Sequence, residues 1–440
     1  MSDAYSNGIH NRAFRAVCAQ SELGYRALRR HASRMNNAAS LALVLLSIAC
    51  SGKDASGLDA SGGSVGSGGS PATTGGSGAS GNSGALGGAA GSGASAGAAG
   101  SVSPPDCETE RAALESAMAA ALEAAATDAS ITAVPDFTLA LEAADGHRFL
   151  YSHGDSSLDT SYESASTSKW VAAAVILDAV DRGALSLDDE PSKWLPYWQA
   201  PGVTLAQLLS FTSGFSEEPL CFNLPGADFA ACVQRAYEVN VDVAPVPGSE
   251  FHYSSTHLQI AGLMAVRAMG VASWAELFAN WQTQTSLFPS AAFDLPSLEN
   301  PRLAGGMHWT AAEYLAFLRA IFDGALLSPA TRSAMLDNQR GAAKVTASPA
   351  LDALNQDWAY GFGNWLECPD AIGADTFDCG AGHRNSSAGA YGAYPFIDFD
   401  HRYLGILARQ GKLGTFREGD ALFGVVAADA ARWADACRTD

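Results

Sequence analysis

Residues 164–177 read SASTSKWVAAAVIL, a short polar turn followed by a long apolar run. This pattern is typical of the first turn of a buried helix. Residues three apart share one face of a helix, so Lys169 is expected to lie beside Ser166. Burial disfavours the charged form of a lysine, and a neutral amine beside a hydroxyl can act as the base that activates it. The common alternative is an N-cap serine with a lysine that extends to solvent, and the pair alone does not exclude it.

Two further stretches carry polar groups that this pair lacks. Residues 251–263 read FHYSSTHLQIAGL, which places Tyr253 before an apolar helix. A phenol beside a lysine ammonium is easier to ionise, and a tyrosinate can pass the serine's proton to a leaving group. Residues 386–392 read SSAGAYG, and such small residues on a strand admit a substrate and present backbone N–H groups to an oxyanion. Taken alone, these stretches are also consistent with a helix cap and a tight strand.

Several motifs in one order resemble the serine β-lactamase/penicillin-binding protein superfamily. The resemblance is to its class C-like branch, which includes β-lactamases, D,D-peptidases, D-aminopeptidases and esterases. Residues 166–169 resemble the nucleophile motif, 253–255 the Tyr-x-Asn element, and 387–389 the Lys-Thr-Gly or His-x-Gly element. Residues 204–215 (TLAQLLSFTSGF) and 303–307 (LAGGM) resemble two other recurrent segments of the family.

The resemblance extends over residues 107–440 and implies acyl transfer through a covalent serine ester, without a cofactor or a metal ion. It implies that Ser166 is the nucleophile and that Lys169 and Tyr253 share the acid and base roles. The residues that it places at the oxyanion or the substrate are Ser166, Ser255, Ser387, Gly389 and Ala390. The expected substrate is a small molecule or a peptide with an acyl group.

Two positions depart from the family pattern and bear on the substrate. Ser255 stands where asparagine is usual, and Ser387 stands where a lysine or histidine helps to hold a substrate carboxylate. His383 and Arg384 are the nearby candidates for the missing cation. We therefore favour an esterase or amidase of neutral substrates over a β-lactamase or D,D-carboxypeptidase. A non-catalytic cell-wall-binding protein with the same fold is the alternative from another class.

The periodicity predicts strands at both ends of the domain and helices between them. Strand-like runs at 137–143 and 147–151 flank Asp145-Gly146, which is a hairpin signal. Further strands are expected at 358–366, 391–399 and 403–408. Helices are expected at 107–128, from 166 to about 182, and at 205–211, 226–239, 255–269, 273–283, 310–323, 328–337 and 419–437. The expected fold class is α/β (α+β): an antiparallel sheet from both chain ends flanked by helices, plus a mostly helical lobe.

The chain divides by composition into a leader (1–50), a Gly/Ser/Ala-rich disordered linker (51–106) and the hydrolase domain (107–440). The apolar run 38–49 is too short to span a bilayer and is typical of a signal peptide. It ends in small residues before Cys50, which resembles a lipoprotein processing site. We expect an exported domain, periplasmic or on the cell surface, with a lipid anchor on Cys50. Plain secretion and a retained anchor are the alternatives.

Six cysteines lie after the linker, and an even number in an exported domain indicates disulfide bonds. We expect the pairs Cys107–Cys437, Cys221–Cys232 and Cys368–Cys379. Metal binding is the rival, but no C-x-x-C or H-E-x-x-H spacing occurs. The net charge of −20 argues against nucleic acid as a partner. A monomer is expected.

Overall fold

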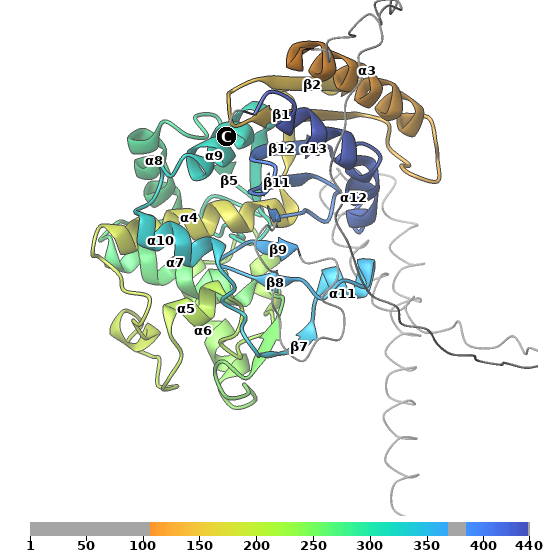
Figure 1. Ribbon diagram of the computed structural model, residues 1–440. Coiled ribbons are helices and arrows are strands. Elements are labelled where there is room, and N and C mark those ends of the chain that lie inside the picture. The colour runs from red at the N-terminus through yellow and green to blue at the C-terminus, as the bar shows by residue number, and fades with distance from the viewer. Residues whose placement is uncertain (1–105, 368–383, 439–440) are drawn as a thin grey trace, which may run out of the picture. The chain divides into compact units, whose positions relative to one another are not determined.

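The computed structural model describes residues 106–367 and 384–438, all within the compact unit Ala98–Asp440 (Figure 1). The α-helices are α3 (Cys107–Ala126), α4 (Ser168–Asp181), α5 (Leu205–Leu209), α6 (Phe229–Asn240), α7 (Thr256–Ala268), α8 (Trp274–Thr285), α9 (Ala311–Phe322), α10 (Pro329–Leu336), α11 (Pro349–Leu354), α12 (Phe416–Gly424) and α13 (Ala427–Asp435). Short 3₁₀ turns are η2 (Ala165–Thr167), η3 (Pro191–Lys193) and η4 (Leu220–Asn223). The strands are β1 (Phe137–Ala143), β2 (Arg148–His153), β3 (Ser161–Glu163), β4 (Glu250–His252), β5 (Ala292–Phe293), β6 (Met307–Thr310), β7 (Lys344–Ala347), β8 (Ala359–Tyr360), β9 (Trp365–Glu367), β10 (Arg384–Ser386), β11 (Tyr394–Asp398) and β12 (Tyr403–Ala408).

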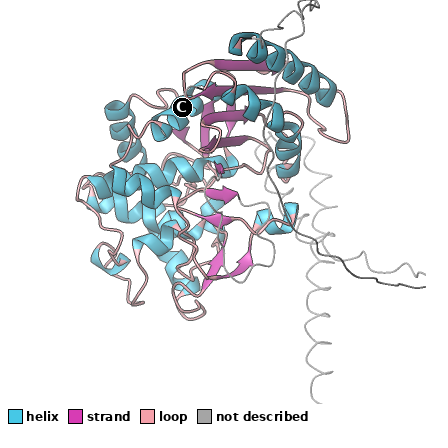
Figure 2. Ribbon diagram, viewed as in Figure 1, coloured by secondary structure: helices cyan, strands magenta, loops and turns pink. Residues whose placement is uncertain are grey.

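A seven-stranded sheet joins the two ends of the domain in the order β2-β1-β12-β11-β10-β9-β8. Its pairings are antiparallel, and β1 pairs with β12 from Thr138 opposite Ala408 to Ala143 opposite Tyr403. Figure 2 shows this sheet with helices on both sides. The expected mixed fold with a sheet built from both chain ends is confirmed.

The alternation of side chains along the strands divides the core into two layers. On β1, Leu139 and Leu141 pack with the end helices α3, α12 and α13, whereas Ala140 belongs to the larger cluster around α4 and α9. On β12, Leu407 faces the end helices and Ile406 faces the larger cluster. The sheet therefore has helices on both faces, and α4 lies in the larger core with most of its side chains buried.

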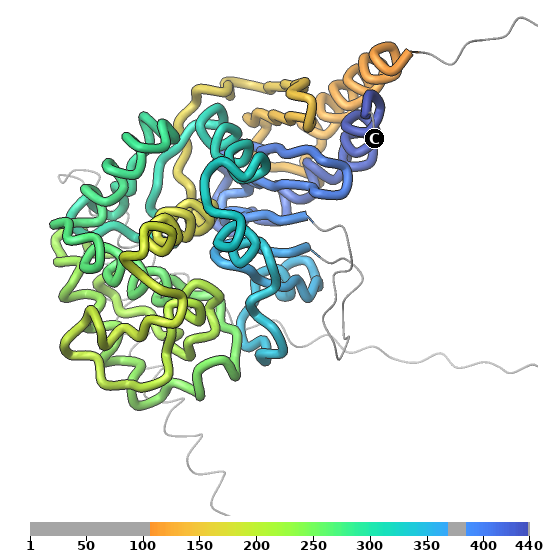
Figure 3. Tube along the Cα trace, turned by 60° about the vertical axis from the view of Figure 1, so that its left-hand side comes forward, coloured from red at the N-terminus to blue at the C-terminus, as the bar shows by residue number. Residues whose placement is uncertain are grey.

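The middle of the chain forms the expected helical lobe, in which α4, α5, α6 and α8 pack around α7 (Figure 3). Two of the helices in this half of the domain begin at a reciprocal capping box, α5 at Thr204 with Gln207 and α9 at Thr310 with Glu313. The lobe also carries two small sheets that were not predicted, β3-β6-β5 and β4-β7. Their strands are two to four residues long, too short to leave a periodic signal.

Two predicted elements are each divided in the structure. The expected strand 358–366 is the hairpin β8–β9, because the backbone turns at Gly363, which has φ of +75°. The expected helix 419–437 is two helices, α12 and α13, because α12 ends at Gly424 and the backbone of Val426, with φ of −119°, departs from the usual helical value before α13 begins. Glycine ends helices readily and branched valines propagate them poorly.

Two of the three expected disulfide bonds are present. Cys107 and Cys437 are bonded across a sequence separation of 330 residues, and Cys221 is bonded to Cys232 across 11 residues. The expected pair Cys368–Cys379 lies outside the described residues. No helix in the described part of the chain is long and apolar enough to cross a membrane.

The long-range disulfide bond is expected to stabilise the domain more than the short one. A closed loop removes entropy from the unfolded chain, so replacing Cys107 and Cys437 by serine should lower the free energy of unfolding by roughly 5–6 kcal/mol. The matched double replacement of Cys221 and Cys232 should cost roughly 3 kcal/mol. Urea unfolding of the two variants measures the difference. A larger loss for the short loop would contradict this expectation.

Candidate active site

The 3₁₀ turn η2 presents Ser166 at the entrance to helix α4. The preceding residue, Ala165, has φ of +42°, a left-handed conformation that costs an alanine about 1–2 kcal/mol. Neighbouring contacts hold the turn in place. The Ser164 N–H donates to the Met307 carbonyl at 2.7 Å, and the Met307 N–H donates to Ser164 Oγ at 3.0 Å. The Trp309 indole N–H donates to Thr167 Oγ1 at 2.8 Å. Strand β6 therefore fixes the position of Ser166.

Lys169 lies beside Ser166, as the three-residue spacing predicts. Lys169 Nζ is 2.9 Å from Ser166 Oγ and donates to the Ala304 carbonyl at 2.7 Å. The lysine is buried, with a relative exposure of 4%. Its pKa is lowered to about 7, first by burial and then by the positive charge of Arg302, while the carboxylate of Glu218 acts in the opposite direction. A neutral amine is therefore available near neutral pH, with a lone pair for the serine proton.

Tyr253 lies between β4 and α7, with its ring against the lysine. Lys169 Nζ is 4.6 Å from the ring centroid, and the ring stacks on Trp365 at 5.1 Å and meets Phe211 edge-on at 5.4 Å. Burial raises the pKa of Tyr253, although its hydrogen bond with Ser166 acts in the opposite direction. Burial thus opposes the tyrosinate that the sequence led us to expect, and it also lowers the charge of the neighbouring Lys169. The phenol keeps its proton and is placed as a donor.

The segment after β10 closes the site from the side of the sheet. Ser387 Oγ donates to the Ser166 carbonyl at 3.1 Å. A Cβ on Gly389 would lie 2.7 Å from the Ser164 carbonyl oxygen, so only glycine fits this close approach. The backbone N–H groups of Ser166 and Ala390 have no backbone acceptor among the described residues. They are therefore available to an oxyanion.

Ser255 belongs to a charged group that the sequence did not predict. Its backbone N–H donates to Glu218 Oε1 at 2.5 Å, and its Oγ accepts from Arg302 Nε at 3.1 Å and Nη2 at 3.0 Å. Arg302 Nη2 also pairs with Glu218 Oε2 at 2.6 Å, and Nη1 donates to Asn223 at 2.8 Å. The shorter side chain of Ser255, where asparagine is usual, thus receives the guanidinium of Arg302.

The expectation that Arg384 supplies the missing cation is wrong. Its guanidinium lies 3.2 Å from Asp398 and over the ring of Phe423 in α12, 5.0 Å from the centroid. Its neighbour on the strand, Asn385, points the other way and donates to the Leu336 carbonyl at 3.0 Å. Arg384 therefore faces the end helices instead of α4. His383 lies outside the described residues.

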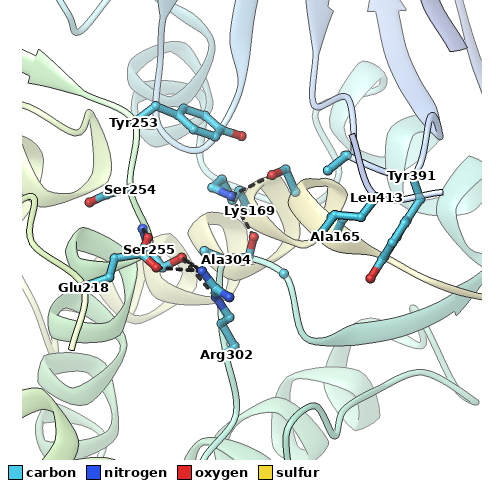
Figure 4. Close-up of a pocket in the computed structure, with 13 residues that line it drawn as sticks. Ala165, Lys169, Glu218, Tyr253, Ser254, Ser255, Arg302, Ala304, Tyr391 and Leu413 are labelled. Carbon is cyan, nitrogen blue, oxygen red and sulfur yellow. Dashed lines mark hydrogen bonds and ion pairs between the residues drawn. The ribbon is translucent and has the colours of Figure 1, made fainter. Parts of the chain in front are cut away.

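These groups line one cavity of about 300 Å³ (Figure 4). Its lining residues are Ala165, Ser166, Lys169, Glu218, Tyr253, Ser254, Ser255, Arg302, Ala304, Gly305, Ala390, Tyr391 and Leu413. In the view of Figure 4, Glu218 and Arg302 lie to one side of Lys169, and Tyr391 and Leu413 lie to the other. Of the predicted site residues, Ser387 and Gly389 lie behind this lining and position it, whereas Ser166, Lys169, Tyr253, Ser255 and Ala390 form part of it.

Among the described residues, the one group of metal-ligating side chains within reach of a shared ion is Cys107, Glu108 and Cys437. Both cysteines form a disulfide bond with each other, so the carboxylate of Glu108 is the one remaining ligand of this group. The predicted site at Cys50 lies outside the described residues.

Several solved structures are similar to this chain. A Bacteroides dorei protein assigned as a β-lactamase is 29% identical, with a TM-score of 0.56, and the match covers 67% of this chain and 93% of that one. The D-amino acid amidase of Ochrobactrum anthropi SV3, in complex with L-phenylalanine amide, is 17% identical, with a TM-score of 0.55 and coverages of 72% and 99%. EstCE1, a hydrolase with promiscuous acyltransferase activity, is also 17% identical, with a TM-score of 0.54 and the same coverages. At such low identities, the last two likenesses show the fold alone.

No curated protein matches the chain. The β-lactamase family matches residues 131–428, more than half of the chain and nearly all of the described domain. This range includes the serine, the lysine and the tyrosine of the cavity. The chain therefore belongs to the β-lactamase family, within the superfamily of β-lactamase-related serine hydrolases.

Proposed function

We propose that this protein is an exported esterase or amidase that acts through an acyl-enzyme ester on Ser166. The observation that carries the proposal is the 2.9 Å contact between Ser166 Oγ and the buried Nζ of Lys169. A lysine whose pKa is lowered to about 7 is a base matched to neutral pH. The D-amino acid amidase and the hydrolase EstCE1 have the same fold, which is compatible with this chemistry.

In the acylation step, the Ser166 hydroxyl proton moves to the neutral Lys169 Nζ while Oγ bonds to the substrate carbonyl carbon. The carbonyl oxygen becomes an oxyanion, which the backbone N–H groups of Ser166 and Ala390 stabilise. When the intermediate collapses, the bond to the leaving group breaks and the leaving atom takes a proton. The phenol of Tyr253 donates that proton and regains one from the Lys169 ammonium. Water then attacks the acyl ester and restores Ser166.

The charge of the cavity supports a neutral substrate. Ser387 is bonded to the Ser166 carbonyl, and Arg384 faces the other side of the sheet. The remaining cation of the described lining besides Lys169 is Arg302, which Glu218 neutralises at 2.6 Å. A substrate carboxylate would therefore meet no net positive charge. This reduces the weight of a β-lactam or D,D-carboxypeptidase substrate.

Replacing Ser166 by alanine tests the proposal directly. The wild-type chain should react with a fluorophosphonate probe and hydrolyse p-nitrophenyl hexanoate, and Ser166→Ala should lose labelling and about 10³-fold or more of the rate. A panel with a chromogenic cephalosporin and a D-Ala-D-Ala peptide separates the alternatives. Faster turnover of either one than of the ester would replace the esterase assignment. Equal labelling of both proteins would exclude Ser166 as the nucleophile, and an absence of both labelling and ester hydrolysis in the wild type would favour a non-catalytic binding role.

The pH dependence of kcat/KM tests Lys169 as the base. The base acts when neutral, so activity should be low in acid and rise with pH through about 7. Arg302→Gln removes a positive charge, which should raise the pKa of Lys169 and move this limb to higher pH. Glu218→Gln should move the limb to lower pH. The exposed Arg235→Gln serves as the control, and a limb that none of the variants moves would exclude Lys169.

We also propose export with a lipid anchor at Cys50. The proposal is supported by the apolar run 38–49 before Cys50 and by the two disulfide bonds, because such bonds persist in oxidising compartments. Metabolic labelling with a fatty acid in a bacterial host should mark the wild-type chain and not Cys50→Ala. Secretion of both proteins without label would leave a plain signal peptide as the correct interpretation.

A further inference from the structure

The Arg302–Glu218 pair is part of the cavity surface and not only a support beneath it. The side chains keep 33% and 30% of their surface exposed, and both line the cavity that contains Ser166. Figure 4 shows the two side chains converging with Ser255 on one side of Lys169. A substrate acylating Ser166 must extend from the reacting carbonyl into this cavity. The pair is therefore within the space that a substrate occupies.

The structure holds the two charges rigidly from several directions. Arg302 is bonded to Ser255 and Asn223 as well as to Glu218, and Glu218 also accepts from the backbone N–H of Ser255. Asn223 follows Cys221, whose disulfide bond to Cys232 closes the loop. A guanidinium that is already held by three acceptors loses little further entropy when it binds another group.

The pair retains hydrogen-bonding capacity. An arginine has five N–H groups, and the contacts of Arg302 with the described residues use four of them, leaving one on Nη1. Each oxygen of Glu218 accepts one of these bonds and can accept another. Within the lining of the cavity, the pair therefore offers both a donor and an acceptor. They are complementary to a group that itself contains an acceptor and a donor, such as an amide.

We propose that the Arg302–Glu218 pair determines specificity by selecting an uncharged acyl group with an amide-like donor and acceptor. This inference rests on the proposed function and names its substrate class. An anionic acyl group is drawn to Arg302 but repelled by Glu218, and a cationic one meets the reverse. In either case the charged acyl group loses its hydration and finds the opposite charge of the cavity already paired, which costs binding free energy. An amide bonds to both members and leaves neither uncompensated.

Four p-nitrophenyl esters with acyl chains of matched length test this proposal on the full-length chain: hexanoate, N-acetyl-β-alaninate, adipate and 6-aminohexanoate. The wild type should hydrolyse the N-acetyl-β-alaninate with the highest kcat/KM and the two charged esters with the lowest. In Glu218→Gln, the adipate to 6-aminohexanoate ratio should rise by about tenfold, and in Arg302→Gln it should fall by about tenfold. The double variant should return the ratio to near the wild-type value.

Two controls separate charge selection from damage to the fold. Arg302→Lys keeps the positive charge, so its adipate to 6-aminohexanoate ratio should stay near the wild-type value. Glu238→Gln, which removes one partner of an exposed ion pair outside the cavity lining, should leave the ratio unchanged. Thermal unfolding of each variant checks that it is folded. If Arg302→Gln does not fold, the change of the ratio in Glu218→Gln alone tests the proposal.

The outcomes distinguish a failure of this specificity proposal from a failure of the proposed Ser166 hydrolase activity. If hexanoate hydrolysis depends on Ser166 but single-charge variants leave the adipate ratio unmoved, the specificity proposal is overturned and the serine hydrolase stands. The same follows if both single variants move the ratio in one direction, or if wild type prefers hexanoate to N-acetyl-β-alaninate. If no ester is hydrolysed in a Ser166-dependent way, both proposals fail.

Discussion

The burial of Lys169 Nζ is the constraint on which the site depends. An amine that donates to the Ala304 carbonyl and contacts Ser166 Oγ in an enclosed position is easily made neutral. The amine stays buried because the helix that carries it, α4, is surrounded by core side chains from its first turn onward. Gly363 shows how closely the neighbours pack, since a Cβ there would lie 2.5 Å from the Lys169 carbonyl oxygen. Packing of the helical lobe is thus part of the chemistry.

Much of the fold and the core of the site could be predicted because their signals are local. The proximity of Ser166 and Lys169 follows from helical spacing, and the sheet from strand-like runs at both ends of the domain. The same reasoning failed for Arg384, because a strand alternates its side chains and one position of register decides the face. Sequence reasoning also missed the pairing of Glu218 with Arg302. The two residues are 84 positions apart in separate loops, and no local pattern indicates that the fold brings them together. The recurrent turn at 303–307, immediately after Arg302, was the one available signal.

The departures from the family pattern are connected in the structure. Ser255 stands where asparagine is usual, and its hydroxyl accepts hydrogen bonds from Nε and Nη2 of Arg302. Ser387 carries no charge, and its hydroxyl secures the backbone of the turn that holds Ser166. Ser255 thus binds the guanidinium of Arg302, and Ser387 stabilises the turn of Ser166 where the family pattern has a residue that binds substrate. Charge in this cavity comes from the helical lobe, whereas the family pattern takes it from the sheet.

The pairing of β1 with β12 has a consequence for how the domain is made. Strand β1 is synthesised more than 250 residues before the strand that flanks it in the sheet, so it must wait for most of the chain to emerge. Until then its apolar face and its edge amides have only β2 as a partner. Contacts so distant in sequence slow folding. The sheet of this enzyme can therefore close only after its last strands have been made, and a chain interrupted before residue 403 would leave one edge of β1 unpaired.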